Sequence, residues 1–136
     1  RAVENLEPYT EVHTLFLESN GLSQISGLDG LVKLRSLYLQ QNVILKIERL
    51  DALTDLKTLN LSQNRIGKVE NLGALTGLET LNLSNTDLTP AAVPSLQRLL
   101  SLTSLALYST DIPPSAAGAI KGSLPRLLTL GLDEVV

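Results

Sequence analysis

The chain has no cysteine, no methionine and no tryptophan, and aromatic residues make up only 3% of its 136 positions. Without cysteine there is no disulfide, no thiolate nucleophile and no zinc site of the usual cysteine-containing kind. Secreted domains of this size are often held together by disulfides, so the absence favours a cytoplasmic location.

Histidine is nearly absent as well, since His13 is the only one. A histidine-based triad would have to use it, and a single surface histidine is more often solvated than catalytic. The phosphate-binding patterns GxxxxGK[ST] and GxGxxG do not occur. The sequence therefore predicts no catalytic residue, no metal ligand and no cofactor, and we expect that the protein is not an enzyme.

Long apolar runs are missing too, because no stretch reaches the roughly 18 residues of a membrane-spanning helix. The N-terminus shows no charged-then-apolar signal pattern. A net charge of -3 with 43% hydrophobic residues is ordinary for a soluble globular protein. We expect neither a membrane nor a nucleic acid as a partner.

The chain is instead rich in leucine, which recurs in a repeated unit. The unit opens at Val12, Leu34, Leu56, Leu78, Leu102 and Leu127, at successive offsets of 22, 22, 22, 24 and 25 residues. One domain, residues 1–136, is thus divided into a partial repeat at 1–11, repeats at 12–33, 34–55, 56–77, 78–101 and 102–126, and a partial repeat at 127–136. Since the chain starts inside a repeat and lacks methionine, we expect a fragment, a processed piece or an engineered chain.

Each unit begins with a short alternating motif, seen as VHTLFLESN at 12–20, LRSLYLQQN at 34–42 and LKTLNLSQN at 56–64. Alternating leucines predict a short strand with one buried face. No single copy can bury its leucines alone, so the strands must stack in parallel. The closing asparagine has an amide that can satisfy backbone groups of neighbouring turns, and threonine replaces it with less reach at 86 and 110.

The second half of each unit is expected to form the outer side of the solenoid. In the first three full copies its apolar residues are spaced by three, which predicts 3₁₀ pieces. In the next two copies Thr89 precedes Pro90 and Ser115 follows Pro114, which predicts capped α-helical turns around 91–99 and 115–121. The fold class is therefore α/β, a curved parallel sheet with 3₁₀ and short α-helical segments outside.

The residues between the leucines should project from the concave sheet, where Phe16 and Tyr38 occupy neighbouring sites flanked by Arg35 and Lys57. Outward aromatic and arginine side chains often carry binding energy at interfaces. The alternative is that the two rings merely cover their neighbours, since single exposed apolar residues need no explanation. The predicted partner-binding residues are Phe16, Tyr38, Arg35, Lys57, Gln40, Asn60, Asn82, His13, Glu18 and Tyr108.

The LxxLxLxxN motif at this period is typical of leucine-rich repeats, and the chain is identified as a member of that family. Through VENLEPYTEV, IERLDAL and KVENLGAL, residues 3–88 resemble its 22-residue, Sds22-like subclass. Within that subclass the phrases are most similar to the leucine-rich-repeat factors that assemble axonemal dynein arms.

The resemblance implies a non-enzymatic scaffold that holds a protein partner on its concave face. It would be a cytoplasmic protein, associated with the cilium or axoneme. The alternative is a regulatory or targeting subunit of an enzyme such as a protein phosphatase. Because terminal repeats normally need polar caps, end-to-end contacts through uncapped repeats are also expected.

Overall fold

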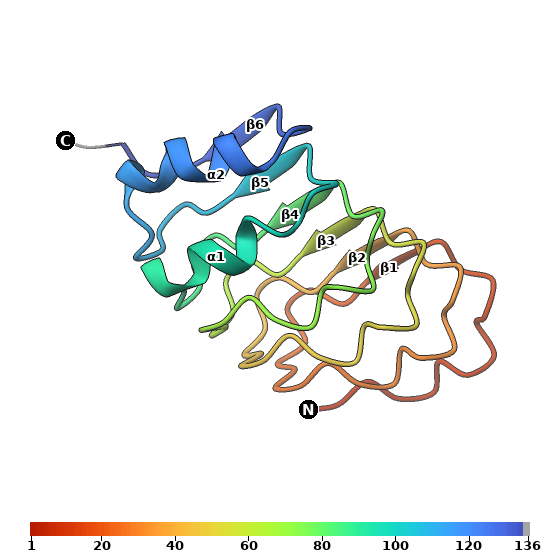
Figure 1. Ribbon diagram of the computed structural model, residues 1–136. Coiled ribbons are helices and arrows are strands. Elements are labelled where there is room, and N and C mark those ends of the chain that lie inside the picture. The colour runs from red at the N-terminus through yellow and green to blue at the C-terminus, as the bar shows by residue number, and fades with distance from the viewer. Residues whose placement is uncertain (135–136) are drawn as a thin grey trace.

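Six short strands lie side by side in one parallel sheet, in chain order, in the computed structural model, which describes residues 1–134 (Figure 1). The strands are β1 (Thr14–Phe16), β2 (Ser36–Tyr38), β3 (Thr58–Asn60), β4 (Thr80–Asn82), β5 (Ser104–Ala106) and β6 (Thr129–Gly131). Leu15 pairs with Leu37, and Leu37 with Leu59, one repeat apart. The predicted α/β solenoid with a parallel sheet is confirmed.

The core lies between this sheet and the outer segments and consists almost entirely of leucine and isoleucine. The middle leucines of the four inner strands, Leu37, Leu59, Leu81 and Leu105, are no more than 1% exposed. Burying one such side chain contributes roughly 1.5–3 kcal/mol. Because each leucine is covered by its equivalents in adjacent repeats, this stabilisation belongs to the stack and not to a single unit.

The outer segments of the first three full repeats are turns. The backbone N–H of Leu31 donates to the carbonyl of Leu28, and that of Leu34 donates to Leu31, both at 3.0 Å. A 3₁₀ helix needs such bonds from consecutive residues, whereas here each bond joins one leucine to the next. Isolated turns therefore replace the expected 3₁₀ pieces, and residues 1–89 contain no helix.

Helices occur in the next two repeats, close to where they were predicted. A 3₁₀ turn, η1 (Pro90–Ala92), leads into α1 (Val93–Leu96), and η2 (Pro114–Ala116) leads into α2 (Ala117–Ser123). Thr89 makes no side-chain capping bond and Ser115 lies inside η2, so the predicted hydroxyl caps do not form. Proline at the first turn starts each helix instead, because its fixed φ suits a helical start.

Candidate functional site

Phe16 and Tyr38 form a stacked pair on the concave side of β1 and β2. The two residues are partners in the sheet register, with ring centroids 4.8 Å apart and planes within 9° of parallel. Phe16 remains 63% exposed, while Tyr38 is half-buried. Such a pair contributes about 0.5–1.5 kcal/mol beyond its buried area. The stack therefore holds an exposed apolar surface in one orientation.

Basic side chains lie at the start of the neighbouring strands. Arg35 precedes β2, is exposed and makes no ion pair within residues 1–134. Lys57 precedes β3, and its Nζ lies 3.7 Å from Glu79 Oε1 with both side chains about half exposed. Exposed pairs of this kind are worth little. His13, ahead of β1, is exposed as well.

Asn60 and Asn82 follow Tyr38 across the sheet, and their amide oxygens are already engaged. Asn60 Oδ1 accepts bonds from the backbone N–H of Ser62 at 3.0 Å and from its hydroxyl at 2.8 Å. Asn82 Oδ1 accepts the N–H of Ser84 at 3.0 Å. Because a backbone N–H can only donate, it fixes which way each amide points. Neither Nδ2 group has an acceptor within residues 1–134.

Two polar residues border the aromatic pair at the ends of the first two motifs. Glu18 is exposed, and its backbone carbonyl accepts a bond from Asn20 Nδ2. Gln40 is half-buried, and its Oε1 is buried with no hydrogen-bond partner in the described part of the chain. Gln40 thus carries a buried, unpaired acceptor two residues after Tyr38.

Tyr108 lies at the opposite end of the sheet, so the predicted site residues fall into two groups. It follows β5, three strand spacings or about 14 Å from Tyr38, and its side chain is 50% exposed. Its ring covers Gly131 of β6, where an added Cβ would lie 2.6 Å from Tyr108 Cζ. The ring can lie at this position because glycine has no side chain. Gly131, which is the register partner of Ala106, was the signal in the sequence, and sequence reasoning did not connect it with Tyr108.

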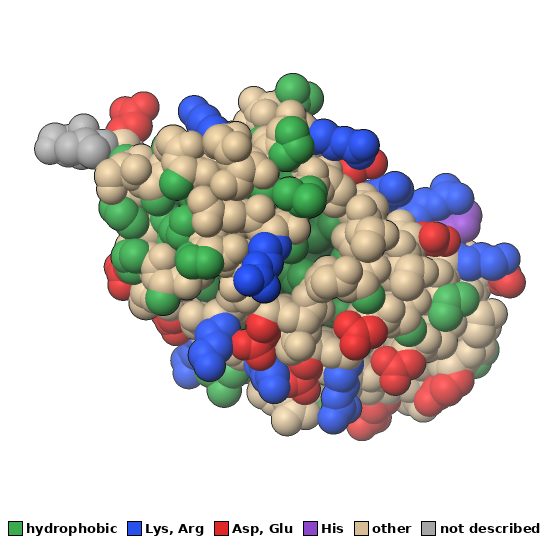
Figure 2. Space-filling view, in the orientation of Figure 1, with side chains coloured by type: hydrophobic (Ala, Val, Ile, Leu, Met, Phe, Trp, Pro, Cys, Tyr) green, Lys and Arg blue, Asp and Glu red, His purple; other side chains and the backbone are tan. Residues whose placement is uncertain are grey.

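The outer side carries a shallow apolar groove that sequence reasoning also missed. It has a volume of about 270 Å³ and lies where short turns give way to helices, lined by Leu72, Leu75, Leu78, Leu99 and Leu100 among others. The space-filling view shows apolar side chains gathered near α1 and α2, with charged side chains along the lower edge (Figure 2). In the sequence, this groove is indicated only by the greater length of the units after Thr86.

Two kinds of site are not found in the described structure. Residues 1–134 contain no cluster of three or more histidine, aspartate or glutamate side chains that could hold a metal ion. None of the helices in that part of the chain has the length and apolar character that a membrane span requires.

Comparison with known proteins supports the repeat architecture. Residues 54–117 match the family model for leucine rich repeats, two copies. The search of curated proteins gives no match. Among solved structures, an internalin of Listeria monocytogenes, InlF, is similar at 28% identity with a TM-score of 0.79, covering 96% of this chain and 37% of that one.

Two further solved structures, each 22% identical, show likeness of fold alone. The functional domain of InlJ from Listeria monocytogenes gives a TM-score of 0.73 over 96% of this chain and 27% of its own. A leucine-rich repeat protein of Leptospira interrogans gives 0.69 over 94% and 38%. The chain thus spans well under half the length of these solved relatives. Its six-strand parallel sheet has the fold of these leucine-rich repeat solenoids, and residues 54–117 match the leucine rich repeat model.

Proposed function

We propose that the chain is a non-enzymatic protein-interaction module that binds a partner on its concave sheet, anchored at Phe16 and Tyr38. The stacked, exposed aromatic pair is the observation that carries this proposal. Aromatic side chains dominate binding energy at interfaces, and a surface already held in place loses less entropy on binding. Arg35, which has no ion-pair partner in the described chain, supplies a cation at the start of β2, three residues before Tyr38.

The sequence resemblance over residues 3–88 supports a more specific form of this proposal. In that form the module is a cytoplasmic scaffold associated with the cilium or axoneme. The same Sds22-like phrases support a second candidate, a regulatory or targeting subunit of a protein phosphatase. Both candidates use the concave face, so they differ in the partner and not in the surface.

The proposal is tested by recovering partners with three forms of the chain from an extract of the source organism. The forms are the unaltered chain, the double variant Phe16→Ala with Tyr38→Ala, and the control Leu45→Ala with Leu100→Ala. The control removes apolar side chains that are 63% and 57% exposed outside the sheet. We expect the aromatic variant, but not the control, to lose the bound partners, with folding checked by circular dichroism.

Equal recovery by the unaltered chain and a folded aromatic variant would contradict the proposal. The two candidates are separated by the identity of what is recovered. A phosphatase retained by the unaltered chain and lost from the aromatic variant favours the regulatory subunit. Axonemal or dynein-assembly proteins with the same dependence favour the ciliary scaffold.

A further inference from the structure

The floor of the concave face between Tyr38 and Tyr108 presents hydrogen-bond donors. The oxygens of Asn60 and Asn82 accept bonds from the serines that follow them, and the two Nδ2 groups have no acceptor in residues 1–134 and are not among the buried unpaired atoms there. Each Nδ2 carries two donors and no acceptor. A ligand that covers these groups must offer them acceptors, because donors buried without partners cost about 1–3 kcal/mol each.

An extended chain in the polyproline II conformation offers such acceptors from its backbone. It has no internal hydrogen bonds, so all its carbonyls are free, and proline has no N–H that would need an acceptor on the floor. An α-helix, in contrast, uses its carbonyls internally and could satisfy the amides only with side chains. The chemistry of the floor therefore favours a proline-rich extended segment.

The spacing of the aromatic side chains agrees with this choice. The centre of the Phe16–Tyr38 pair lies two strand spacings, about 9.6 Å, from the centre of the asparagine pair. The ring of Tyr108 reaches from β5 over Gly131 of β6, so it lies about 7–12 Å from that centre on the other side. Polyproline II returns to the same face every three residues, or about 9.3 Å. One face of the helix would thus meet the aromatic pair, the asparagines and Tyr108 in successive turns.

We propose that the concave face binds a proline-rich segment in the polyproline II conformation, lying across the strands from β1 to β6. The Phe16–Tyr38 pair holds one side chain of the segment, and Tyr108 holds another that lies two turns further along. Asn60 and Asn82 donate to carbonyls between them. This assignment rests on the proposed function, because it names the chemistry of the partner at that same surface.

The test is a nuclear magnetic resonance titration of the ¹⁵N-labelled full chain with acetylated, amidated decaproline, about 31 Å long in polyproline II form. We expect saturable shifts of the Asn60 and Asn82 side-chain amides and of backbone amides near Tyr38 and Tyr108. Pentaproline is too short to contact both the Phe16–Tyr38 pair and Tyr108 while it covers the asparagines. We therefore expect it to bind about tenfold more weakly than decaproline.

The decisive variant is Asn60→Asp with Asn82→Asp. Each aspartate keeps an oxygen for the serine N–H but replaces the outward donors by an acceptor, so the fold is retained. We expect decaproline affinity to fall at least about tenfold. The matched control, Gln63→Glu with Asn85→Asp, adds the same charge at exposed positions beside the floor and should retain binding.

Three results would overturn the assignment. The first is that decaproline shows no saturable binding. The second is that the decisive variant and its matched control bind decaproline with equal affinity. The third is that the concave face binds an acidic α-helical peptide of the same length instead of decaproline. The proposed function would survive any of these, provided that partner recovery still depends on Phe16 and Tyr38. Loss of that dependence would instead contradict both the proposed function and the polyproline II assignment.

Discussion

At the residue scale, the closing asparagines of the motif connect neighbouring repeats. Asn64 Oδ1 accepts the N–H of Ile44 at 3.0 Å, and its Nδ2 donates to the carbonyls of Leu39 and Leu61 at 2.9 and 3.1 Å. Thr86, one repeat later, donates only to Leu83 of its own unit. The predicted shorter reach of threonine is confirmed, since Thr86 and Thr110 both donate within their own units and this motif position makes no side-chain bond to the preceding repeat there.

Replacement of Asn64 by leucine should lower the free energy of unfolding by roughly 1–3 kcal/mol, because buried backbone groups lose their partners. Urea unfolding followed by circular dichroism measures the change. Asn20→Leu is the matched control, since Asn20 Nδ2 makes a single bond to Glu18 within its own unit. A loss for Asn64→Leu no larger than that for Asn20→Leu would contradict the role of the amide.

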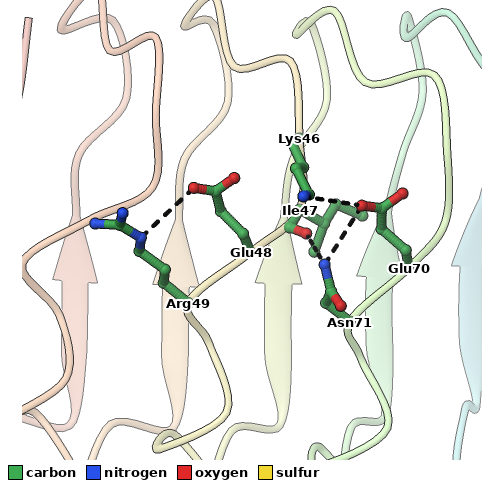
Figure 3. A network of polar contacts seen from close by, with 6 residues as sticks. All are labelled: Lys46, Ile47, Glu48, Arg49, Glu70 and Asn71. Carbon is green, nitrogen blue, oxygen red and sulfur yellow. Dashed lines mark hydrogen bonds and ion pairs between the residues drawn. The ribbon is translucent and has the colours of Figure 1, made fainter.

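A second residue-scale feature is a left-handed backbone position that recurs in the outer turns. Asn5, Gly27, Arg49 and Asn71 occupy it, with φ between 58° and 72°. Asparagine and glycine tolerate this conformation, whereas arginine does not favour it. Asn71 also uses it to donate from Nδ2 to the carbonyl of Ile47 at 2.8 Å, while Arg49 only pairs with Glu48 at 3.5 Å (Figure 3).

Arg49→Asn should therefore raise the free energy of unfolding by roughly 0.5–1 kcal/mol, through relief of strain and a new bond equivalent to that of Asn71. The lost ion pair matters little, since the arginine side chain is 59% exposed. Thermal unfolding compares this variant with Arg49→Ala, which removes the same charge and keeps a Cβ-bearing residue that cannot form the bond. Equal melting temperatures for the two variants would refute the explanation.

At the element scale, the outer segments show where a spacing rule stops being informative. Leucines three apart fix which side chains are buried, and Leu28, Leu31 and Leu34 are all buried. They do not determine whether the two residues between them also donate their N–H groups to carbonyls three residues earlier. Those additional bonds distinguish a 3₁₀ helix from isolated turns. Prolines 90 and 114 carried the stronger signal, because a fixed φ and a missing N–H act on the backbone directly.

Helix α2 is held to the core by one side chain, since Ile120 is its only buried residue. Ile120→Ala should lower the free energy of unfolding by about 2–5 kcal/mol, because it leaves a cavity under a seven-residue helix. Lys121→Ala, at the exposed neighbouring position, should change it by less than about 0.5 kcal/mol. Urea unfolding of both proteins checks this, and a loss below about 1 kcal/mol for Ile120→Ala would show that α2 is anchored elsewhere.

At the scale of the whole molecule, each repeat touches only its neighbours, so burial depends on position along the stack. The middle leucines of the inner strands are buried, whereas Leu15 of β1 and Leu130 of β6 are half-buried. In such a stack the units opening most easily are those with one neighbour.

Hydrogen–deuterium exchange of the 136-residue chain should follow this order. We expect the amides of β1 and β6 to exchange at least about tenfold faster than those of β3 and β4. Mass spectrometry of peptides covering each strand measures the rates. Equal protection of all six strands would show that the chain opens only as a single unit.

The concave surface shows what part of a site a repeat pattern can predict. Strand register follows from the period, so the adjacency of Phe16 and Tyr38 could be deduced from the spacing of the repeats alone. The direction of the Asn60 and Asn82 amides could not, because it depends on which local N–H each oxygen accepts. The ring of Tyr108 over Gly131 depends likewise on a side-chain rotamer, which the column of residue types does not specify.

The most direct measurement of partner binding is the dissociation constant of a purified, recovered partner for the unaltered chain, for Tyr38→Ala and for the control Leu45→Ala. If the aromatic pair is the anchor, Tyr38→Ala weakens binding by about thirtyfold, equivalent to about 2 kcal/mol, and Leu45→Ala leaves it unchanged. An unchanged constant for a folded Tyr38→Ala protein would contradict binding at this face.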